Sequence, residues 1–99
     1  MPDVRVTIPK NIKHQAPFAV AVFTSEPLLL ELELLVDGVR RPFGLEVGGE
    51  ATPSGPKQEL GVDGAVDVTI LDWGTARIGA KVKLVALTQQ DSNLGTVIV

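Results

Sequence analysis

The sequence predicts a single all-β domain over residues 1–99, an antiparallel β-sandwich of about seven short strands. Apolar residues recur at every second position through most of the chain, and Gly-, Pro- and Asp-containing turns separate these segments. The alternation of strands and helices that is typical of a parallel sheet is missing. A length of 99 residues is typical of one domain, and a hydrophobic fraction of 44% is enough for a packed core.

The first part of the chain contains three alternating segments. Residues 4–8 form a half-buried strand that ends at Pro9, and residues 18–23 are apolar on both faces, which is typical of a central strand. In residues 28–36 the side chains of Leu28, Leu30, Leu32, Leu34 and Val36 are expected to point inward and those of Glu31 and Glu33 outward. A helix is the alternative for this Leu- and Glu-rich segment. The strict alternation and the following Asp37-Gly38, a strong hairpin signal, favour the strand.

The strand that returns from this hairpin is predicted over residues 39–47, and it places alternate side chains on one face (Val39, Arg41, Phe43, Leu45 and Val47). Pro42 cannot donate a ladder hydrogen bond, which predicts an edge strand or a bulge. Residues 48–64 are rich in Gly and Pro and are expected to form a long mobile connection, in which residues 58–62 could add a short strand.

Three further segments complete the prediction. Residues 65–71 form a strand with Val66, Val68 and Ile70 inward. Residues 77–88 form the next one, and the following side chains are expected to point inward: Ile78, Ala80, Val82, Leu84 and Ala86. A polar turn at 89–93 leads to a closing strand at 94–99.

The segment 71–87, LDWGTARIGAKVKLVAL, resembles the E–F corner and F strand of fibronectin type III-like and immunoglobulin-like domains. This resemblance implies an immunoglobulin-like arrangement of the sandwich. Arg77 stands where those families often carry the corner Tyr, and the Cys pair and central-strand Trp of antibody domains are absent. The resemblance therefore implies an architecture and no functional residues.

The residue chemistry argues against an enzyme and against a cofactor. With one His and no Cys, thiol nucleophiles, His/Cys metal sites and disulfides are poor candidates. His14 has no nucleophile or orienting group nearby in sequence, so we interpret it as a solvated loop residue. Glu31 and Glu33 are interpreted as surface charges that pair across strands with Lys81 and Lys83, rather than as catalytic carboxylates.

Metal and nucleic-acid sites are equally poorly supported. Asp63, Asp67 and Asp72, or Asp91 with Asn93, match no calcium-loop spacing and are ordinary turn residues. The glycines at 38, 48 and 49 form no phosphate-binding fingerprint. The basic residues Arg5, Lys10, Lys13, Arg40 and Arg41 lack interleaved aromatic residues, and the net charge is −3, so no nucleic-acid partner is expected.

Apolar side chains on the outward positions predict a protein–protein surface. If the even-numbered residues of the strands face the core, six apolar residues face outward: Leu29, Leu35, Leu71, Trp73, Val85 and Leu87. Trp73 is the expected hot spot, and its replacement by Ala is expected to release a partner without unfolding the chain. The alternative is that residues 48–64 fold over these positions, or that strands switch face at bulges.

The sequence thus predicts a non-enzymatic structural or assembly protein that docks on other protein subunits. No signal peptide or membrane-spanning segment is recognisable, so we expect cytoplasmic synthesis and no membrane partner. In size and expected fold the chain is similar to the small decoration proteins of tailed phages, which implies a virion component that binds capsid subunits or further copies of itself, as a homo-oligomer. The alternative function is an adhesion or carbohydrate-binding β-sandwich module, which would need an aromatic platform.

Overall fold

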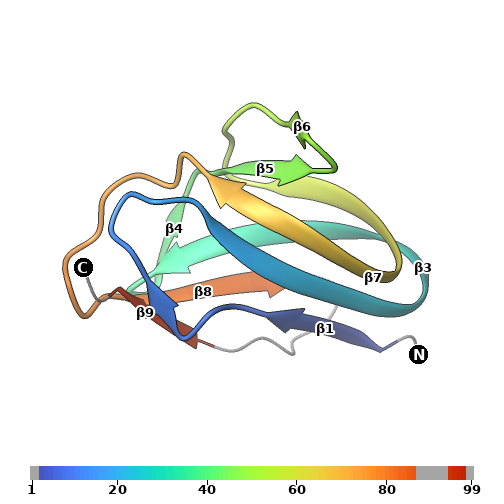
Figure 1. Ribbon diagram of the computed structural model, residues 1–99, viewed down its shortest axis with the longest axis horizontal. Coiled ribbons are helices and arrows are strands. Elements are labelled where there is room, and N and C mark those ends of the chain that lie inside the picture. Colours follow the sequence, from blue (N-terminus) through green and yellow to red (C-terminus); the bar gives the residue numbers. More distant parts are fainter. Residues whose placement is uncertain (1–2, 87–93, 98–99) are drawn as a thin grey trace.

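Strands of one mixed sheet account for most of the residues that the computed structural model describes, 3–86 and 94–97 (Figure 1). In chain order they are β1 (Val4–Thr7), β2 (Asn11–Ile12), β3 (Phe18–Val36), β4 (Val39–Arg41), β5 (Gly44–Val47), β6 (Glu50–Ala51), β7 (Gln58–Leu71), β8 (Lys81–Ala86) and β9 (Leu94–Val97). These described ranges contain no helix, which confirms the all-β prediction. The helix alternative for residues 28–36 is therefore wrong.

The strands lie in the order β2-β9-β8-β3-β7-β5-β6, and β1 and β4 also pair with β3. The pairing of β2 with β9 is parallel and the other pairings are antiparallel. The sheet curls into a half-barrel around its apolar face (Figure 1). This continuous mixed sheet replaces the predicted pair of antiparallel sheets, and an immunoglobulin-like sandwich of seven strands is not confirmed.

The curl comes from β3 and β7, which pair over most of their lengths and bend together (Figure 1). Their register runs from Phe18 opposite Ile70 to Thr24 opposite Gly64, and resumes with Leu28 opposite Val62. Three residues of β3, 25–27, therefore lie against Asp63 alone, and this bulge bends the strand. Pro27 lies within the bulge, where the ladder needs no N–H from it.

Two predictions about strand boundaries are wrong, because β3 and β7 continue through the bend. The separate strands expected at 18–23 and 28–36 are the two halves of β3, and those expected at 58–62 and 65–71 are the two halves of β7. The predicted mobile connection therefore ends at Gln58, and it also contains the short strand β6. An insertion of two extra residues leaves the inward-facing parity of β3 unchanged, which is why simple alternation identified both halves correctly.

The core lies on the concave face and follows the predicted alternation closely. The buried side chains from β3, β7 and β8 include Val20, Val22, Leu30, Leu32, Leu34, Val68, Ile70, Val82 and Leu84. Leu28 and Val66 are half-buried at the margin of this core. Ala19, Ala21 and Phe23 are exposed, so the first half of β3 is central in the sheet without being covered on both faces.

The Asp37-Gly38 hairpin is confirmed. Both residues have positive φ, 52° and 79°, as a two-residue type I′ turn requires. The returning chain pairs with β3 in β4, and after Pro42 it pairs with β7 in β5. Phe43 and Leu45 were predicted on one face with Val39; they are buried, whereas Val39, in the short strand β4 that pairs only with β3, is exposed.

The predicted strand 77–88 begins four residues late, at Lys81. Asp72, Gly74 and Gly79 have positive φ, which interrupts the extended backbone between β7 and β8. As a result Ile78 is 68% exposed instead of pointing inward, while Ala80 is buried. β9 confirms the closing strand through Val97, and the predicted turn at 89–93 lies outside the described residues.

Candidate interaction surface

Trp73 belongs to the core, and its prediction as an interface residue is wrong. The residue is 1% exposed, its Nε1 donates a hydrogen bond to the Ala16 carbonyl at 2.8 Å, and its ring meets Phe18 edge-on with centroids 5.6 Å apart. The backbone leaves the extended conformation at Asp72, so the strand alternation that placed Trp73 outside no longer holds there. Alternation alone could not reveal this turn, although Gly74 signalled one.

The other predicted interface residues differ in exposure and do not form one continuous surface. Leu29 is 64% exposed, and Leu35, Leu71 and Val85 are half-buried. Leu87 lies outside the described residues. Leu35 is opposite Lys83 of β8 and Val85 is opposite Glu33 of β3, so they share one stretch of sheet, whereas Leu71 lies opposite Gly44 of β5. Among the described residues, Leu29 is therefore the one member of the predicted set that is exposed.

Three exposed apolar residues were not predicted: Phe23, Val39 and Ile78. Phe23 was assigned to a strand that is apolar on both faces, Ile78 was placed on an inward position, and Val39 was placed on one face with Phe43 and Leu45. For Ile78 the missing signal was the interruption of the extended backbone at residues 72–80, which strand alternation does not reveal.

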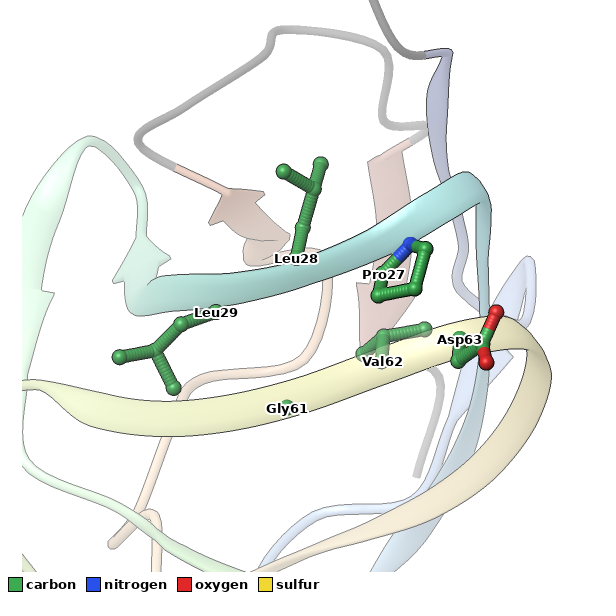
Figure 2. Close-up of a pocket in the computed structure, with 6 residues that line it drawn as sticks. All are labelled: Pro27, Leu28, Leu29, Gly61, Val62 and Asp63. Atoms are coloured by element: carbon green, nitrogen blue, oxygen red, sulfur yellow. The ribbon is translucent and has the colours of Figure 1, made fainter.

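Leu29 borders a shallow hollow of about 450 Å³ beside the bend of β3 and β7. Figure 2 shows its lining residues: Pro27, Leu28, Leu29, Gly61, Val62 and Asp63. Leu28 and Leu29 point to opposite sides of β3, as neighbouring residues of a strand do (Figure 2). Gly61 is the cross-strand partner of Leu29, and a Cβ added there would meet no atom within 4 Å. The absence of a side chain at Gly61 thus leaves one flank of Leu29 open.

The next outward pair along the same two strands consists of two acidic residues. Glu31 lies directly opposite Glu59, and like charges in this position destabilise a sheet. One pair further, Glu33 is 8% exposed and is held by Arg40 at 3.4 Å and Lys57 at 3.9 Å, although it was predicted to face solvent. The predicted Glu–Lys ladder is wrong, because the register sets Lys83 opposite Leu35.

We call the surface formed by Pro27, Leu29, Glu31, Glu59, Gly61 and Asp63 the bend surface. It combines an apolar hollow with three carboxylates, and the cations nearest to it in register serve Glu33. Apolar contact area bordered by charge of one sign is typical of a surface that selects its partner electrostatically.

The opposite end of the molecule carries cations and two of the other three exposed apolar residues, Val39 and Ile78, whereas Phe23 belongs to neither end surface. There a hollow of about 530 Å³ is bordered by His14, Val39, Arg41 and Arg77 among others. Lys13 precedes His14 and Ile78 follows Arg77, and we call the surface formed by Lys13, Val39, Arg77 and Ile78 the basic end.

The polar side chains around this second hollow anchor residues 72–80. The Nδ1 atom of His14 is hydrogen-bonded to the Ala76 carbonyl, and Arg41 donates to the Thr75 carbonyl and, at 3.5 Å, to that of Trp73. Arg77 pairs with Asp37 at 3.3 Å. His14 is exposed, as expected for a loop residue, but its hydrogen bond to Ala76 also links the segment between β2 and β3 to residues 72–80. These contacts are structural, which makes a ligand site in this hollow a weaker interpretation.

The described residues form neither a metal-binding cluster nor a membrane-spanning helix. Across residues 3–86 and 94–97, no three His, Asp or Glu side chains gather closely enough to hold a metal ion. Nor does that part of the chain include a helix with the length and apolar character needed to cross a membrane.

Comparisons with protein-family models, with curated proteins and with solved structures found no match to this chain. The resemblance of residues 71–87 to immunoglobulin-like domains and the similarity to phage decoration proteins therefore stay predictions.

Proposed function

We propose that this chain is a non-enzymatic structural or assembly protein that docks on another protein through the bend surface. The observation that carries the proposal is the exposed, apolar Leu29 beside an in-register pair of glutamates, Glu31 and Glu59. Neither feature contributes much to the isolated fold, because Leu29 stays 64% exposed and the paired carboxylates repel. Both features favour a partner that offers apolar contact and positive charge.

Carboxylates at the rim of an apolar contact act mainly on specificity and on the rate of association. A cationic side chain placed between Glu31 and Glu59 would replace their repulsion with attraction. Burial of Leu29 would add hydrophobic free energy of about 25 cal/mol for each Å² of apolar surface that is removed from water. The hollow beside Gly61 offers room for a partner's apolar side chain.

The narrower proposal is a capsid decoration protein, in which the partner is the shell of a virion. It is supported by the all-β fold and by the exposed apolar and acidic bend surface. The alternative, carbohydrate binding, has less support, because Phe18, Phe43 and Trp73 are buried and Phe23 is the one aromatic residue at the surface. A single half-exposed ring makes a poor platform for stacking a sugar.

A density gradient of the protein's own source material tests the proposal. We expect the wild-type chain to sediment with a large assembly and the Glu31→Lys/Glu59→Lys variant to sediment as a small free protein. The matched control is Glu46→Lys/Glu50→Lys, which makes the same change of charge at the β5–β6 hairpin and should sediment like the wild type. A wild-type chain that migrates free, or three proteins that sediment alike, would overturn the proposal.

A further inference from the structure

Charge and exposed apolar residues are divided between the two ends of the long axis, which measures 36 Å. The bend of β3 and β7 lies at one end, and β4 and residues 72–80 lie at the other (Figure 1). The bend surface carries Glu31, Glu59 and Asp63 beside Leu29. The basic end carries Lys13 and Arg77 beside Val39 and Ile78, and Arg41 lines the same hollow. Arg77 pairs with Asp37 at 3.3 Å, so one of these three positive charges is neutralised and the end keeps a net positive charge. The negative charge of the bend surface is therefore complementary to the positive charge of the basic end, and both surfaces expose apolar side chains.

We propose that the partner of the bend surface is a second copy of this chain, bound through its basic end. The inference rests on the proposed function and names the occupant of that docking surface. In this arrangement Lys13 and Arg77 of one copy face the Glu31–Glu59 pair of the next, and Val39 or Ile78 enters the hollow beside Leu29 and Gly61. The copies are then related head to tail.

The same charges disfavour the symmetric alternatives. Two bend surfaces that meet face to face would bring carboxylates against carboxylates, and two basic ends would bring cations together, and like charges brought together at an interface are costly. The net charge of −3 opposes any self-association at long range. Salt screens that repulsion beyond about 8 Å at physiological ionic strength, while pairs in direct contact are screened less. A head-to-tail contact leaves one free surface at each end, so it continues into a ring or a filament.

A charge-swap experiment tests the contact with purified protein. Sedimentation velocity over a wide range of concentration should show that the wild type self-associates at low salt. In about 1 M salt, where the Debye length is about 3 Å, this association should weaken. The variants Glu31→Lys/Glu59→Lys and Lys13→Glu/Arg77→Glu should each be monomeric, with a self-dissociation constant raised about tenfold or more. An equimolar mixture of the two should associate again, because each altered surface then meets its complement on the other variant.

The recovery in the mixture shows that both variants are folded. The matched control is Glu46→Lys/Glu50→Lys alone, which has the same net charge as Glu31→Lys/Glu59→Lys but leaves both contact surfaces intact, so it should self-associate like the wild type. The inference is overturned if the wild type is monomeric throughout, if either variant associates alone, or if the mixture stays monomeric. A wild type that is monomeric when pure but sediments with a large assembly in source material overturns the self-contact alone. The proposed docking function then stands with a different protein as the partner.

Discussion

Glu31 of β3 lies directly across the sheet from Glu59 of β7, with the exposed Leu29 and the bare Gly61 as the adjacent outward pair. One pair further in the other direction, Glu33 is partnered by both Arg40 and Lys57. The same face thus contains one glutamate that is neutralised twice and two that face each other. Among the described residues, Arg40 and Lys57 form ion pairs with Glu33 and none is formed with Glu31 or Glu59, so the repulsion within the bend surface is not offset by an ion pair.

The first prediction concerns the cost of this pair. Replacement Glu31→Gln removes one of two facing charges and should raise the free energy of unfolding by about 0.2–1 kcal/mol. The measurement is the urea midpoint, and the gain should shrink in high salt because the repulsion is screened. Glu46→Gln is the matched control, since Glu46 lies opposite Thr69 and Ala51 and should change little. A midpoint lowered by Glu31→Gln would mean that the pair does not repel.

The second prediction concerns Trp73. Its buried indole packs on Phe18 and donates to the Ala16 carbonyl, so Trp73→Ala should cost about 3–5 kcal/mol of stability. Equilibrium unfolding followed by circular dichroism measures the loss. Ile78→Ala is the control, because this exposed residue contributes little to the core. A Trp73→Ala variant as stable as the wild type would contradict the buried position and restore the prediction made from the sequence.

The third prediction compares two glycines. Gly38 has a φ of +79° in the type I′ turn, so Gly38→Ala should destabilise the hairpin by about 1 kcal/mol or more. Gly61 has no such φ and has open space at its Cβ position, so Gly61→Ala should be neutral or raise stability by about 0.4–1 kcal/mol. Urea midpoints of the two variants should therefore move apart. Equal shifts would argue against the turn.

The fourth prediction concerns Gly95 on β9. A Cβ there would lie 2.5 Å from Ile12 Cδ1 and 2.6 Å from the Pro9 carbonyl oxygen. The Pro9 carbonyl oxygen is part of the backbone and cannot move as freely as a side chain. Gly95→Ala should therefore weaken the parallel pairing of β2 with β9 and lower the free energy of unfolding by about 1–3 kcal/mol. Hydrogen exchange at residues 11–12 should accelerate more than exchange in β7. Unchanged exchange at β2 would contradict this close contact.

The inward-facing residues were predicted well from the sequence, because successive side chains of a strand point to opposite faces and the buried face is the apolar one. Leu30, Leu32 and Leu34 are buried as expected, and the hairpin at Asp37-Gly38 has the expected turn. The continuity of β3 could not be predicted, since a bulge that contains Pro27 resembles the end of one strand and the start of another. The parallel pairing of β2 with β9 also lacked a signal, because two residues are too few to show a period.

The candidate surface was predicted in part. Leu29 is exposed as expected, whereas Trp73 is buried because strand alternation was carried past the turn at Asp72. The facing of Glu31 and Glu59 depends on the register of strands that are far apart in sequence. Local periodicity cannot predict such pairs, because it does not determine which residues of two distant strands lie opposite each other.

Solvent accessibility at residue 29 in the assembled state tests the central claim most directly. The chain contains no Cys, so the variants Leu29→Cys and Glu46→Cys each offer one thiol for labelling with a maleimide. Both should react at similar rates in dilute, monomeric protein. In the large assembly recovered from source material, or in self-associated protein, labelling of the Leu29→Cys variant should slow strongly while that of Glu46→Cys should not. Equal labelling of both variants in the assembled state would show that the bend surface stays open to solvent and would contradict the claim.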